Sequence, residues 1–177
     1  PGNPEIAAQL ATLTAMVADI RVGATSGVSN VAPSDGPPSS DPLGKLLDAQ
    51  IDRLRDRAHG MDPAEALQEF LDLLGQLPPE ASGTIRFRVK ANIGHRYLAL
   101  DDGENASRWL REAFDEAPFD QRAVANHALA YFVRGEVRSA YDYAVEELRR
   151  DPTNRILGSH LPQFAVRLPE IERPMED

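Results

Sequence analysis

The chain has 177 residues, of which 42% are hydrophobic and 6% aromatic, and its formal net charge is −9. This length and composition fit one globular, helix-rich domain with an additional arm and do not fit two independent domains. The acidic balance argues against a nucleic-acid or anionic membrane surface, because phosphate binding requires clustered Lys and Arg. The absence of cysteine excludes disulfides, thiolate zinc sites and a cysteine nucleophile.

Two features bear on targeting. No apolar run reaches the roughly 18 residues of a membrane-spanning helix, so we expect no membrane span and a cytoplasmic location. The start, PGNPEIAAQL, carries neither an initiator methionine nor a basic signal-peptide region. We therefore expect a trimmed or tagged piece of a longer chain.

The N-terminal segment, residues 1–22, is predicted to form an amphipathic helix over residues 5–22. Its apolar residues alternate in steps of four and three, as in a coiled-coil seam: Ile6, Leu10, Leu13, Val17 and Ile20. A single helix of this length is weak in water. It is expected to pair with a second copy, giving a possible homo-oligomer, or with a partner or its own domain. Residues 23–42 are dense in Gly, Ser and Pro and are predicted to form a flexible linker.

The first clear helix-start signal is at Asp41, a predicted N-cap that is followed by Pro42. A stripe of Leu43, Leu46, Leu47, Ile51 and Leu54 follows. Asp62 and Glu65 form a capping box before a second helix, which ends at Pro78-Pro79. Further helices are predicted over 84–100, 104–117, 121–134 and 136–150, and Phe119 is expected to staple Val124. No stretch alternates at period two, so the predicted fold is all-α.

The chain repeats with a period of 34 residues, because residues 87–120 align without gaps on residues 121–154. Seven positions are then identical: Arg88/Arg122, Ala91/Ala125, Asn92/Asn126, Tyr97/Tyr131, Ala106/Ala140, Glu112/Glu146 and Pro118/Pro152. Such self-similarity indicates stacked helical hairpins. Small residues at Gly94 and Ala106 let the two helices of a hairpin approach each other, and Pro118 ends the second helix.

These positions resemble the tetratricopeptide repeat (TPR) family. The first unit carries Ile93, Gly94, Tyr97, Ala106, Leu110, Ala113 and Pro118 at signature places, and the second carries Ala128, Tyr131, Gly135, Ala140 and Pro152. His127 and Glu147 depart from the pattern. The resemblance implies about three repeats over residues 43–168, counting a divergent unit at 45–78. It also implies a C-terminal capping helix beginning at Asn154, with residues 169–177 as a tail.

Catalytic and metal-binding patterns are not found in the sequence. None of His59, His95, His127 and His160 lies in an HExxH motif or at an i, i+4 spacing, and phosphate-cradling loops and a nucleophile elbow are absent. The abundant carboxylates fall at helix starts and on predicted outer faces. We therefore expect no catalytic residues, no metal and no cofactor.

The TPR resemblance implies that the first helix of each hairpin lines a concave groove. The candidate binding residues there are Arg88, Asn92, His95, Arg122, Asn126, Leu129 and Phe132. Paired arginines and asparagines predict hydrogen bonding to a peptide, preferably an acidic one. The alternative is that the asparagines only tie neighbouring helices together. His95 and Ala91 stand where chaperone-tail binders need Asn and Lys, which argues against that ligand.

The expected function is therefore a protein interaction module, a TPR adaptor that binds a protein or peptide partner and is not an enzyme. Two alternatives stay open. One is a small TPR chaperone for a secreted protein, against which the long linker counts. The other is the regulatory or sensor region of a larger multidomain enzyme.

Overall fold

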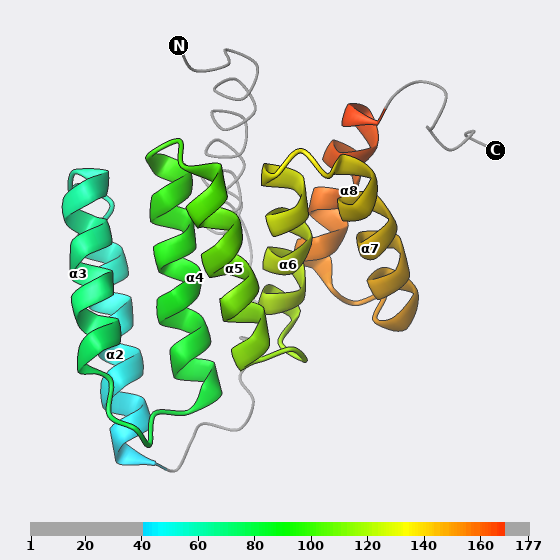
Figure 1. Cartoon of the computed structure of the whole chain (residues 1–177). Helices are drawn as coiled ribbons and strands as arrows, with labels where there is room; N and C mark the ends of the chain where they lie inside the picture. Colours follow the sequence, from blue (N-terminus) through cyan, green and yellow to red (C-terminus); the bar gives the residue numbers. More distant parts are fainter. Residues whose placement is uncertain (1–40, 169–177) are drawn as a thin grey trace, which may run out of the picture.

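The computed structural model describes residues 41–168, and within this range the chain is entirely helical (Figure 1). Seven helices and no strand occur in the described residues. The helices are α2 (Pro42–Arg57), α3 (Pro63–Gln76), α4 (Gly83–Ala99), α5 (Gly103–Glu116), α6 (Gln121–Val133), α7 (Val137–Arg150) and α8 (Arg155–Arg167). The all-α prediction is confirmed. The predicted N-terminal helix, most of the linker and the tail at 169–177 lie outside the described residues.

Helix starts follow the capping residues in the sequence. Asp41 accepts backbone N–H bonds from Leu43 and Gly44, both at 3.0 Å, and Asp62, Ser82, Asp102, Asp120 and Asn154 cap the later helices in the same way. Such caps satisfy N–H groups that have no partner inside the helix. The bounds of α4 to α7 agree with the predicted ones to within one residue at each end.

The helices form a stack of antiparallel hairpins. The first helices of the hairpins are α2, α4 and α6, and α8 continues their series; the second helices are α3, α5 and α7. The first helices contact one another in the order α2, α4, α6, α8, and each second helix also packs against the first helix that follows it. Figure 1 shows this progression from α2 and α3 at one end to α7 and α8 at the other. The described helices are all too short or too polar to cross a membrane.

Small residues hold the hairpins close, as the repeat predicted. A Cβ atom added at Gly94 would lie 2.8 Å from two side-chain atoms of Leu110. Ala106, Ala128 and Ala140 are fully buried at the corresponding contacts. Larger apolar side chains fill two main core clusters, one around Ile51, Phe70 and Ile93 and the other around Leu110, Leu157 and Phe164. Burial of these side chains is the main force that stabilises the stack.

Two predictions of burial are wrong. Phe119 is 98% exposed and does not staple Val124, because Val124 turns inward to the core while Phe119 projects from the loop between α5 and α6. Leu43 and Leu46 are also exposed, although the predicted stripe of α2 included them. Within α2 the buried face runs through Leu47, Ile51 and Leu54. Leu46 is one residue before Leu47, so its side chain points about 100° away from that face.

Candidate functional site

The first-helix wall consists of Arg88, Asn92 and His95 on α4 and Arg122 and Asn126 on α6. These residues follow one another in steps of four and three, so each helix presents them on one face. The two faces meet where His95 Nε2 lies 3.3 Å from Asn126 Oδ1. All seven predicted binding residues lie on these two neighbouring helices, and folding places five of them on this wall.

Arg88 is engaged within the fold, which corrects its placement as an exposed groove residue. Its guanidinium forms a short ion pair with Asp48 and lies 2.7 Å from Asp52, and both carboxylates belong to α2. Only 14% of the Arg88 side chain is exposed. Because Asp48 and Asp52 are one helical turn apart, the planar guanidinium can reach both. Arg88 therefore joins the first helix of one hairpin to that of the next.

The asparagines also make internal hydrogen bonds. Asn92 Nδ2 donates to the backbone carbonyl of Arg88 at 2.8 Å, within the same helix. Asn126 Oδ1 accepts a hydrogen bond from His95 Nε2 across the α4–α6 boundary. Asn126 thus connects α4 and α6, as the alternative interpretation of the asparagines expected. Both side chains remain partly exposed, so their remaining donors and acceptors lie at the surface.

Arg122 differs from its repeat equivalent Arg88. It pairs with Asp120, the N-cap of its own helix, at 2.9 Å, and its guanidinium carbon lies 5.5 Å from the centre of the Phe87 ring. Burial of Asp120 opposes its ionisation, but hydrogen bonds and the charge of Arg122 outweigh this and lower the pKa of Asp120 below 3.8. The Arg122 side chain is 40% exposed. It is the more accessible of the two arginines.

Leu129 and Phe132 do not lie on an open surface, which corrects the two remaining site predictions. Both are buried in the core. The ring of Phe132 lies 5.0 Å from that of Phe164 on α8. The physical reason is the position of α8, which packs along α6 and covers the face on which these two residues lie.

Two groups near the wall were missed from the sequence. His160 on α8 is buried, and burial together with the charge of His95 lowers its pKa from 6.5 to about 4. Its Nδ1 atom has no hydrogen-bond partner. The other missed group is the carboxylate pair Asp48 and Asp52. Their spacing of four was visible in the sequence, but nothing there showed that this face of α2 meets Arg88.

The charges on and beside the wall are balanced. Three carboxylates (Asp48, Asp52 and Asp120) pair with three guanidinium groups (Arg55, Arg88 and Arg122). A carboxylate-rich ligand would meet these acids as well as the arginines. The preference for an acidic peptide therefore loses its electrostatic basis.

No group of three His, Cys, Asp or Glu residues within 41–168 is placed to hold a metal ion. A shallow hollow of about 980 Å³ along α5 is lined by charges of both signs, including Asp101, Asp102, Arg108 and Arg134. Asp102 there caps α5 by accepting the Asn105 N–H at 3.0 Å. Glu112, which also lines this hollow, lies 4.0 Å from Arg108.

Comparison with known proteins assigns no family. No protein-family model matches the chain, and no curated protein matches its sequence. The TPR resemblance thus stays a prediction that rests on the repeat itself.

Proposed function

We propose that this chain is a non-catalytic protein interaction module of about three TPR-like units and a capping helix, which binds an extended peptide along the first-helix wall. The observation that carries the proposal is the placement of Arg122. The Arg122 side chain is 40% exposed, and its guanidinium lies over the Phe87 ring, one helical turn from Asn126. An arginine oriented by a carboxylate and an aromatic ring is suited to planar recognition of a carboxylate or a peptide carbonyl.

The ligand is a peptide that carries both charge signs. Its acidic or carbonyl group contacts Arg122, and its amide groups contact Asn126 and His95. A basic side chain is favoured near Asp48 and Asp52, because these carboxylates remain about half exposed although Arg88 contacts both and Arg55 contacts Asp52. Complementary signs at two separate points fix the register and direction of a bound peptide.

The test begins with a peptide selected on the protein itself. The full chain is immobilised, a displayed library of random peptides is selected against it, and the affinity of one selected peptide is measured by fluorescence anisotropy. We expect Arg122→Glu and Asn126→Ala to weaken binding by about tenfold or more each, which corresponds to about 1.4 kcal/mol. The loss for Arg122→Glu should be smaller at high salt.

The matched control is Arg138→Glu on α7, where the arginine is also exposed and paired with a nearby carboxylate, Asp142. This variant reverses the same charge but lies outside the wall, and it should bind like the parent. If the control and the wall variants bind with the parental affinity, the peptide site is elsewhere and the proposed function of this wall is refuted.

A further inference from the structure

The end of the stack formed by α2 and α3 has an uncovered helix face. Each later first helix packs against the second helix of the hairpin before it: α4 against α3, α6 against α5 and α8 against α7. No helix in the described part of the chain takes this place against α2. Leu46, which is 60% exposed, and Leu43 lie on this uncovered face. Exposed leucines at the end of a helical stack mark a surface that another helix can cover.

The uncovered face of α2 has a regular pattern. Leu43, Leu46, Gln50, Arg53 and Arg57 follow one another in steps of three and four, so they form one stripe along the helix. The stripe is apolar at the start of α2 and basic at its end.

The neighbouring face of α3 has the opposite charge. Glu65, Glu69, Asp72 and Gln76 are spaced by four, three and four residues and form an acidic stripe. Because α2 and α3 are antiparallel, the basic end of one stripe lies beside the acidic part of the other.

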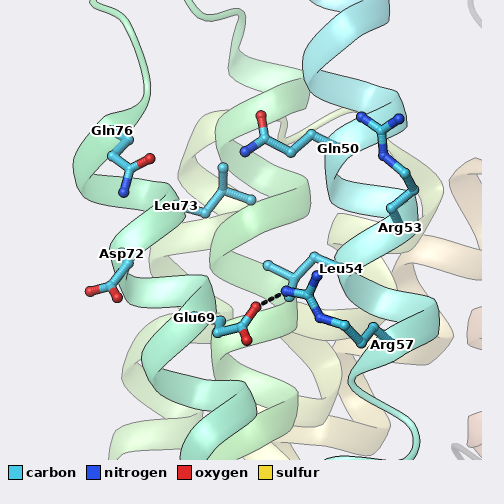
Figure 2. A pocket seen from close by; sticks show the side chains of 8 residues that line it. All are labelled: Gln50, Arg53, Leu54, Arg57, Glu69, Asp72, Leu73 and Gln76. Carbon is cyan, nitrogen blue, oxygen red and sulfur yellow. Dashed lines mark hydrogen bonds and ion pairs between the residues drawn. The ribbon is translucent and has the colours of Figure 1, made fainter.

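A cleft of about 330 Å³ separates the two stripes (Figure 2). Its floor contains Leu54 and Leu73, which are buried, and its rims carry the charged residues. Arg57 and Glu69 form an ion pair across the cleft. This pair fixes the level at which the two stripes face each other.

Two further charges on the rims have no ionic partner within residues 41–168. Arg53 on α2 is exposed and makes no salt bridge within residues 41–168. Asp72 on α3 is also exposed, and its carboxylate accepts only a hydrogen bond from Gln68 Nε2, at 2.8 Å. The same surface thus presents one unmatched cation and one unmatched anion, on opposite rims.

We propose that this end face, defined by the two stripes and the cleft, docks onto the same face of a second copy of the chain. A twofold axis parallel to the helices places α2 of each copy against α3 of the other. The second copy's α3 then takes the position that the second helix of a preceding hairpin would occupy.

A second copy is the favoured occupant because the face is complementary to itself. Rotation about this twofold axis does not change the height of a residue along the cleft. Arg57 of one copy therefore lies at the same height as Glu69 of the other. Arg53 of one copy then meets Asp72 of the other, and each unmatched charge gains a partner twice in the dimer. Such an interface, with one patch used by both subunits, is the usual arrangement of a homodimer.

The experiment uses the full chain in sedimentation equilibrium over a loading range of about 1 to 300 µM, a range that covers weak homodimers. The parent should form a dimer that weakens at high salt. Arg53→Glu and Asp72→Arg should each weaken dimerisation by about tenfold or more, because each variant opposes like charges at two places in the dimer. Neither residue makes a salt bridge in the fold, so circular dichroism and melting should match the parent.

Charge exchange separates this interface from any other. An equal mixture of the Arg53→Glu and Asp72→Arg variants should dimerise, since each opposed pair is then complementary. The double variant Arg53→Glu, Asp72→Arg should dimerise by itself for the same reason. Arg149→Glu on α7, an exposed arginine outside the end face, is the matched control and should leave dimerisation unchanged.

Three results would overturn the proposal. One is a parent that stays monomeric at the highest concentration. Another is a parental dimer in both single variants, which would locate self-association elsewhere, such as in residues 5–22. The third is failure of the mixture and of the double variant to recover the dimer. All three are independent of peptide binding on the first-helix wall, because Arg122 and Asn126 are unchanged.

Discussion

Acidification should destabilise the protein through His160. Its pKa in the folded state is about 4, against an ordinary value of 6.5, because burial and the charge of His95 both disfavour the imidazolium. The unfolded state therefore takes up the proton first as the pH falls. His160 therefore does not lower the free energy of unfolding above pH 6.5, and it lowers this free energy progressively as the pH falls toward 4.

The magnitude follows from the difference between the two pKa values. A difference of roughly 2.5 units at about 1.4 kcal/mol per unit gives a loss of about 3 kcal/mol once the pH has fallen below both pKa values. About 2 kcal/mol of this should be lost by pH 5. His127, whose pKa is also lowered, by burial and then by Arg111, adds a loss of the same sign.

A His160→Phe variant isolates the contribution of His160. Phenylalanine keeps an aromatic ring beside Phe164, whose ring lies 6.0 Å from that of His160, and His160 Nδ1 has no hydrogen-bond partner within residues 41–168 to lose. Urea unfolding at pH 8, 6, 5 and 4.5 gives the free energy of unfolding of both proteins. The difference between them should change by about 2 kcal/mol between pH 8 and pH 5 in favour of the variant. If the free energy of unfolding falls equally steeply with pH in both proteins, His160 is not buried in the folded state.

Three further predictions concern stability, each measured by urea unfolding at pH 8. Phe70→Ala should lower the free energy of unfolding by about 3 to 5 kcal/mol because it empties a fully buried site. Phe119→Ala, on a 98% exposed side chain, should change it by less than about 0.5 kcal/mol. Equal effects of the two variants would contradict the assignment of Phe70 to the core. Gly83→Ala should lower the free energy of unfolding by about 1 to 3 kcal/mol because the new Cβ overlaps the carbonyl oxygen of Glu116. Gly75 lies in open space, so Gly75→Ala should stabilise α3 by up to about 1 kcal/mol. A Gly83→Ala variant as stable as the parent would mean that α4 and α5 are farther apart. Arg88→Glu should destabilise the protein by about 1 to 2 kcal/mol because it places a third carboxylate beside Asp48 and Asp52. A variant as stable as the parent would show that Arg88 does not pair with these two carboxylates.

The sequence by itself determined where the helices begin and end and how they follow one another. Capping residues such as Asp41, Asp62 and Asn154 act on backbone groups two or three positions away, so their effect is local and readable along the chain. The 34-residue repeat added the hairpin order, and Gly94 opposite Leu110 confirms the close approach that it predicted.

The tertiary structure alone decided which polar residues remain accessible. Arg88 and Arg122 occupy equivalent places in the repeat, yet one is held by two carboxylates of α2 and the other stands partly exposed over Phe87. Leu129 and Phe132 are core residues, and the packing of α8 along α6 places the Phe164 ring 5.0 Å from that of Phe132.

The end face likewise depends on neighbours that the periodicity of α2 cannot reveal. Leu46 and Leu47 are adjacent in an apolar stripe, but one is exposed and the other buried. Helical spacing fixes which residues share a face of α2, whereas the packing of α4 against only one of those faces decides which leucines are covered. Local interactions along the chain thus determine the helices, while contacts between residues far apart in the sequence determine which side chains remain available for binding.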